Sequence, residues 1–100
     1  MPSLSMTIPH AIGQEEALER MKKESKAALE AFGDRVTDVK QEWNDNRVNF
    51  SFSAMSFSIE GNMEVNSDSV ALSAKLPMAA FMFKGMIEER IRERFGEVLA

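Results

Sequence analysis

Few side chains in this sequence have the types and spacing that catalysis or metal binding requires. His10 is the only histidine and the chain has no cysteine, which excludes a histidine-based metal cluster, a thiolate site and a cysteine nucleophile. Any acid–base role of His10 would need a carboxylate partner. We expect its ring to hydrogen-bond a neighbouring strand or turn, with a polar contact to a ligand as the alternative.

Paired carboxylates are no better as candidates for chemistry. Glu15 with Glu16, and Glu88 with Glu89, are adjacent on expected helices, where neighbours point about 100° apart and cannot share a proton by adjacency alone. The sequence contains no phosphate-binding glycine loop, no GxSxG and no HExxH motif. We therefore expect no enzymatic activity, no cofactor and no metal.

Composition narrows the class of protein. A chain of 100 residues with 44% hydrophobic residues can bury one core, which predicts a single domain over residues 1–100. The net charge of −4 argues against nucleic acid, because binding there depends largely on Lys and Arg at the phosphates. No stretch resembles a signal peptide or approaches the roughly 20 apolar residues of an integral membrane segment. We expect a cytoplasmic protein.

The spacing of apolar residues predicts a strand and then a helix. Leu4, Met6 and Ile8 alternate with polar residues, so a short strand ends at Pro9. A helix is then expected between Gly13 and Gly33. Its apolar stripe consists of Leu18, Met21, Ser25, Ala28 and Phe32.

From residue 36 to residue 76 the period becomes two, which indicates strands joined by tight turns. The Asn- and Asp-rich segments 44–46 and 66–68 are expected turns. Apolar residues change from even to odd numbers between Ala54 and Phe57, so a hairpin or bulge is expected at 54–56. Gly61 falls where an inward side chain is due, which suggests a bulge or the close approach of a helix.

A second helix is expected to begin at Pro77, and it carries more apolar residues than one buried face needs. One stripe can cover the sheet: Ala80, Phe83, Ile87, Ile91, Phe95 and Val98. Four further residues point elsewhere: Met78, Phe81, Met82 and Met86. They either fold into the core or form an interface, because Met is flexible and common at adaptable binding surfaces.

These elements predict an α+β fold in the order β-α-β-β-β-β-α. Strands with a single apolar face need a cover on that side only, so we expect a two-layer sandwich. It consists of an antiparallel sheet of about five strands, with two helices on one face and a polar opposite face.

Several short features together carry a family resemblance over Ser3 to Ala100. They are Pro9-His10 after the first strand, the Gly13 helix start, the Gly61 and Val70-Ala71-Leu72 strands, and Ile87 and Ile91 ahead of Leu99-Ala100. In these the chain resembles the bacterial family of polyhydroxyalkanoic acid (PHA) system proteins, which is named for its genes' position near polyester-granule genes. The resemblance implies an association with polyhydroxyalkanoate storage and carries over no catalytic residue.

Two functional hypotheses follow, with a third as a plainer option. The first is a non-enzymatic binding or structural module that attaches to a PHA granule surface or a granule protein through Met78, Phe81, Met82 and Met86. It would then be granule-associated within the cytoplasm. The second is a small hydrophobic-ligand carrier, with a pocket between the layers for an acyl chain or hydroxyacid and with His10 or an acidic residue as its polar contact. The third is a homodimer formed through the same apolar residues.

Overall fold

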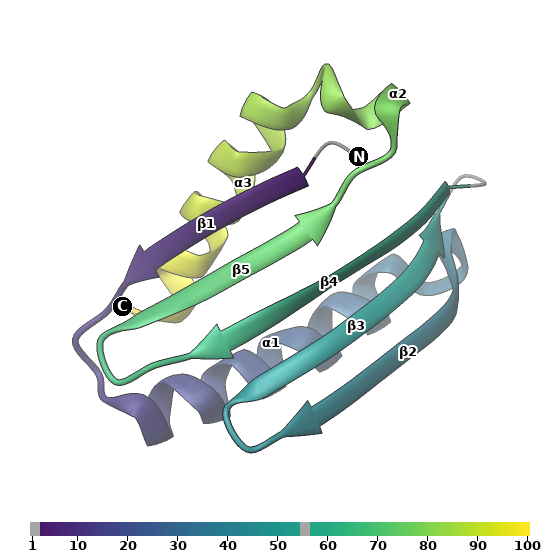
Figure 1. The fold of residues 1–100 in the computed structure, drawn as a ribbon. Coiled ribbons are helices and arrows are strands. Elements are labelled where there is room, and N and C mark those ends of the chain that lie inside the picture. The colour runs from purple at the N-terminus through teal and green to yellow at the C-terminus, as the bar shows by residue number, and fades with distance from the viewer. Residues whose placement is uncertain (1–2, 55–56) are drawn as a thin grey trace.

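The computed structural model describes residues 3–54 and 57–100, in which five strands form one antiparallel sheet (Figure 1). The strands lie in the order β1-β5-β4-β3-β2. Their bounds are β1 Ser3–Pro9, β2 Val36–Asn44, β3 Arg47–Ala54, β4 Phe57–Val65 and β5 Ser69–Lys75. The strands nearest the two ends of the chain, β1 and β5, are therefore neighbours.

One face of the sheet supplies most of the core. A row of side chains from all five strands crosses this face: Met6, Leu72, Met63, Val48 and Trp43. Four of these are buried and Trp43 is half-buried. Leu4, Val65 and Val70 are almost completely enclosed on the same side. The alternation of apolar and polar residues thus correctly predicted which face carries the core.

Helix α1 spans Gln14–Phe32, between the two glycines expected to bound it. Gly33 has a φ of 50°, a conformation that glycine adopts without steric cost, and it leads into the short 3₁₀ turn η1 (Gly33–Arg35). Ala17 and Met21 are buried against the sheet, but Phe32 at the other end of the predicted stripe is 52% exposed. Phe32 thus lies on the predicted face of α1, together with Met21, but it is not buried because the space between this end of α1 and the sheet is left open.

The edge strand β2 contains an irregularity that the sequence did not reveal. Its pairing with β3 shifts between Thr37 and Lys40, and Asp38 has a φ of 53°. This is the geometry of a β-bulge, which bends and twists the strand locally. The expected break at 54–56 includes residues 55 and 56, which lie outside the described residues. On either side Ala54 pairs with Phe57, so the chain reverses there and the apolar parity changes.

Gly61 marks neither a bulge nor a helix contact. It pairs in continuous register with Phe50 on one side and Ala74 on the other. A Cβ atom at this position would lie 2.8 Å from Cζ of Phe50 and 3.0 Å from Cα of Ala74, and closer still to the carbonyl oxygen of Ser73. The expectation of a bulge or a helix contact is therefore wrong, and the close neighbours are the backbone of β5 and the ring of Phe50.

The predicted second helix is divided into two parts. A single turn, α2 (Met78–Phe81), follows Pro77, and α3 (Lys84–Val98) begins after an interruption at Met82 and Phe83. The chain changes direction at this interruption, so that α3 runs back along β1 (Figure 1). Phe83 was expected to cover the sheet and is instead 53% exposed, whereas Ile87, Ile91, Phe95 and Val98 pack against the core as predicted.

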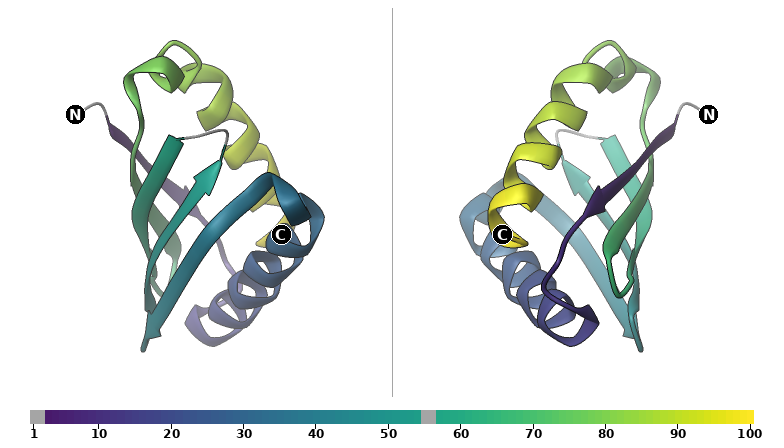
Figure 2. Two further views of the ribbon diagram at one scale, coloured as in Figure 1. Left: turned by 90° about the vertical axis from the view of Figure 1, so that its right-hand side faces the viewer. Right: turned by 90° about the vertical axis from the view of Figure 1, so that its left-hand side faces the viewer.

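Helices α1 and α3 both lie on one face of the sheet, which confirms the predicted two-layer α+β fold (Figure 2). They approach one another where α3 ends, and they diverge towards the end of the sheet that carries α2 (Figures 1 and 2). The helix layer is therefore a V over the sheet.

Candidate functional site

Exposed apolar side chains gather at one end of the molecule. Among the described residues, eight large hydrophobic side chains are exposed: Phe32, Val39, Phe57, Met78, Phe81, Met82, Phe83 and Met86. They belong to the end of α1, the first part of β2, the start of β4, and the segment from α2 into α3. All these parts lie at the same end of the sheet, since Val36, Ala54 and Phe57 pair there and Ser3 pairs with Lys75, which leads to α2 (Figure 1). We call these eight residues the apolar end.

The four residues singled out in the sequence are all part of the apolar end. Met78 is 76% exposed, Met82 87%, Met86 50% and Phe81 46%. The structure thus places them at the surface, which removes the core alternative; an interface formed by them stays a prediction. Lys84 lies over the ring of Phe81, with Nζ 5.8 Å from the ring centre, and adds one positive charge to this surface.

A groove of about 350 Å³ lies between the sheet and the diverging helices. Its wall on α1 includes Met21, Ser25, Ala28 and Phe32; its floor includes Val39, Val48, Phe50 and Phe52; its wall on α3 includes Ile91 and Phe95. The rings of Phe50 and Phe52 stack, with centroids 6.4 Å apart. The groove exists partly because Ser25 and Ala28, which face the sheet, are too small to fill the space beneath α1.

Polar bonds close the narrow end of the V. Arg94 of α3 donates two hydrogen bonds to Glu24 of α1, from Nε to Oε2 and from Nη2 to Oε1 at 2.8 Å. Arg20 of α1 donates to the carbonyl oxygens of Val98 at 3.2 Å and Ala100 at 2.5 Å. In the described part of the chain, the hydrogen bonds between α1 and the C-terminal segment involve only Arg20 and Glu24. The rest of α1 is free to stand away from α3.

The contact with Arg94 also sets the ionisation of Glu24, whose side chain is only 13% exposed. The hydrogen bond that Arg94 donates lowers the pKa of Glu24; partial burial opposes this shift, and the positive charge of Arg94 adds to it. The same hydrogen bond, followed by the charge of Glu24, raises the pKa of Arg94. The bridge between the two helices is therefore a charged pair at neutral pH.

His10 lies at the opposite end from the apolar end. Its Nδ1 accepts a hydrogen bond from the backbone N–H of Ile12 at 3.3 Å, and its Nε2 lies 3.0 Å from the carbonyl oxygen of Asn66. A neutral ring protonated on Nε2 satisfies both contacts. The expected hydrogen bond to a neighbouring turn is therefore present, and His10 does not line the groove.

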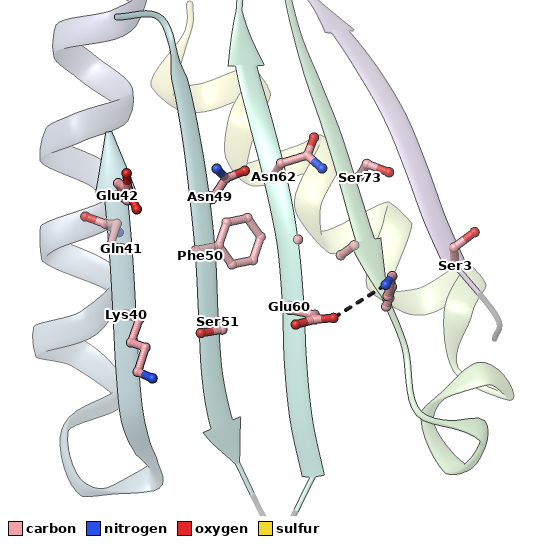
Figure 3. A pocket seen from close by; sticks show the side chains of 13 residues that line it. Ser3, Lys40, Gln41, Glu42, Asn49, Phe50, Ser51, Glu60, Asn62 and Ser73 are labelled. Carbon is pink, nitrogen blue, oxygen red and sulfur yellow. Dashed lines mark hydrogen bonds and ion pairs between the residues drawn. The ribbon is translucent and has the colours of Figure 1, made fainter. Parts of the chain in front are cut away.

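The outer face of the sheet is polar, as expected, and it is also slightly hollowed (Figure 3). One row of it crosses all five strands and consists of Ser5, Ser73, Asn62, Asn49 and Glu42. Glu60 and Lys75 form an ion pair at 3.5 Å on neighbouring strands (Figure 3). Both members are largely exposed, so this pair contributes little to stability.

Within residues 3–54 and 57–100, no three His, Asp or Glu side chains gather in a way that could hold a metal ion. In the same part of the chain, no helix is long and apolar enough to cross a membrane.

The sequence pattern singled out Met78, Phe81, Met82 and Met86 as surplus apolar residues. It did not indicate that Phe32, Val39 and Phe57 are exposed as well. The residues that line the groove were not predicted as a group. A signal for the groove was present in the small side chains of Ser25 and Ala28 within the apolar stripe of α1. Such residues leave space wherever the facing strand does not supply larger ones.

Fold and surface together define a small α+β protein whose two helices cover one face of an antiparallel sheet, with its exposed apolar residues gathered at one end. No curated protein and no solved structure matches the chain. The family described as "Putative polyhydroxyalkanoic acid system protein (PHA_gran_rgn)" matches residues 4–99. The chain belongs to this family, as its resemblance predicted.

Proposed function

We propose that this protein is a non-enzymatic binding module that attaches to the surface of a polyhydroxyalkanoate granule through its apolar end. The observation that carries the proposal is the gathering of exposed Phe and Met side chains at one end of the fold. Scattered apolar side chains are normal on a protein surface, whereas a contiguous group commonly marks an interaction site. Membership of the PHA system family supports a polyester surface as the partner.

The energetics suit a reversible attachment. If about 300 Å² of apolar surface were buried, the gain would be about 7 kcal/mol at ~25 cal/mol per Å², before the costs of association. The flexible side chains of Met78, Met82 and Met86 can adapt to a surface without regular structure.

Co-sedimentation with polyhydroxyalkanoate particles tests this proposal. The double variant Phe81→Ser/Met82→Ser removes two large exposed side chains and is expected to bind more than tenfold more weakly. The matched control is Ala79→Ser/Gly85→Ser, which changes two exposed positions of the same segment without removing a large apolar group. Equal binding by the two folded variants would refute the proposal.

The same end is also the candidate interface of a homodimer. Light scattering of the particle-free protein gives its mass directly. A dimer that the Phe81→Ser/Met82→Ser variant converts to a monomer, with particle binding unchanged, would assign the apolar end to self-association instead of granule attachment.

A second candidate function is favoured by a separate observation. The groove between α1 and α3 has the position expected of a pocket in a small hydrophobic-ligand carrier, and its volume lies within the range of known ligand sites. A ligand that binds the folded protein alone raises its Tm. A rise in Tm with acyl ligands is therefore the expected result, and its absence would remove this candidate.

A further inference from the structure

We propose that the groove between α1 and α3 binds one unbranched acyl chain and accommodates up to about twelve of its carbons, with the tail inside and the polar head at the mouth. This inference rests on the second candidate function and names the class of ligand for it. The groove is not lined by Met78, Phe81, Met82 or Met86.

The groove is a consequence of how the helix layer is held. Glu24 and Arg94 tie α1 to α3 at the narrow end of the V, and beyond this point α1 presents Ser25 and Ala28 to the sheet. Both side chains are too short to fill the space between α1 and the sheet. Phe32 remains 52% exposed and Val39 40% exposed near the open end. An apolar ligand that lies between them would cover surface that the fold itself leaves in contact with water.

Most polar side chains that line the groove already have partners. Gln41 donates from Nε2 to Oγ of Ser25 and accepts at Oε1 from Nε1 of Trp43 at 3.1 Å. Glu24 is held by Arg94. A polar ligand would have to compete for these groups, whereas an aliphatic chain needs none of them. The groove therefore selects an apolar ligand.

Lys40 and Ser51 also border the groove, and they do so from the other face of the sheet. They pair with each other in the row next to Gln41 and Phe50, and adjacent residues of a strand point to opposite faces. Their side chains are thus directed towards the polar face, as Figure 3 shows for both residues. The groove itself offers no free basic group for a carboxylate, so the head of the ligand stays at the mouth.

The volume limits the length of the chain. A water-sized group occupies about 30 Å³ in the liquid, and a methylene group is of similar size. A groove of about 350 Å³ thus has room for about twelve such groups. A shorter chain leaves part of the apolar surface uncovered, and a longer one extends into water.

This limit predicts a characteristic dependence on chain length. Each methylene that enters the groove should strengthen binding about fourfold, so decanoate should bind about 200-fold more tightly than hexanoate. From dodecanoate to hexadecanoate the affinity should change less than about fourfold, because the added carbons remain outside. Decanoate and its methyl ester should bind alike, since the head makes no contact in the groove.

Displacement of a fluorescent fatty acid, with all chains below their micelle concentrations, measures these affinities on the full chain. The variant Ala28→Phe fills the groove from α1 and is expected to abolish binding while leaving Tm unchanged or higher. Its matched control is Ala27→Phe, which places the same ring at an exposed position of the same helix and should bind as the wild type does.

Each outcome decides the inference. Binding that rises steadily up to hexadecanoate, or that Ala28→Phe leaves intact, would overturn it. If Ala28→Phe does not fold, the chain-length series on the wild type still decides. Absence of binding by every chain would refute the carrier function itself. If acyl chains bind but affinity does not level off beyond dodecanoate, only the proposed ligand class is refuted. The variant Phe81→Ser/Met82→Ser should show the same dependence on chain length as the wild type, because neither residue lines the groove.

Discussion

Replacing Gly61 by alanine tests how closely the sheet is packed beneath the groove. The added Cβ would lie 2.8 Å from Cζ of Phe50 and 3.0 Å from Cα of Ala74, and closest of all to the carbonyl oxygen of Ser73. The ring can move, but two of these three atoms belong to the backbone of β5. Overpacking typically costs about 1–3 kcal/mol, and an unyielding backbone places Gly61→Ala at about 2–3 kcal/mol.

Urea unfolding followed by the fluorescence of Trp43, the single tryptophan, measures this loss, and thermal unfolding should show a Tm lower by about 10–20 °C. The control is Gly85→Ala in α3, where a Cβ has no atom within 4 Å, so the substitution should be neutral or stabilising by up to about 1 kcal/mol. Adding Phe50→Leu should restore less than half of the loss, because the backbone contacts persist. The reasoning is refuted if Gly61→Ala unfolds within about 0.5 kcal/mol of the wild type.

Three further predictions concern the core, the bridge between the helices and the turn at His10. Leu4→Ala should lower the free energy of unfolding by about 2–5 kcal/mol in urea titrations, because Leu4 is 1% exposed and belongs to the hydrophobic core. The pKa of Glu24 is lowered in the folded state, so its contribution to stability is complete above the unfolded pKa of about 4.3 and is lost as the pH falls through the folded pKa. Unfolding of Glu24→Gln measured from pH 7 to pH 2 should therefore show a weaker loss of stability in acid than the wild type does. His10→Ala should cost about 1–2 kcal/mol through its two ring hydrogen bonds and leave acyl-chain binding unchanged; weaker chain binding in a folded variant would contradict this placement.

The sheet was predictable because its apolar residues alternate regularly. Leu4, Met6 and Ile8 are buried as expected, and the change of parity after Ala54 matches the chain reversal between β3 and β4. The bulge at Asp38 was not predictable, since Asp38 and Val39 break no obvious pattern at the end of a strand. A one-residue shift near an edge changes few buried contacts, so it leaves little trace in the sequence.

The helices show the limit of reasoning from periodicity. A stripe tells which face of a helix is apolar, but not whether neighbouring elements cover that face along its whole length. Phe32 lies on the predicted face of α1 and Phe83 lies just before α3, and both are exposed at the end where the helices diverge. The interruption at Met82 and Phe83 was also hidden, since it contains neither proline nor glycine and the apolar spacing continues through it.

The bulge in β2 has a consequence for how such molecules behave when crowded. A regular outer strand offers its unpaired backbone groups to a neighbour, and proteins concentrated on a surface meet one another often. Asp38, with its φ of 53°, bends the outer strand, and the charged Lys40 and Glu42 follow it. Both features oppose strand-to-strand joining between molecules. At the β2 edge, closely packed molecules would therefore resist joining strand to strand.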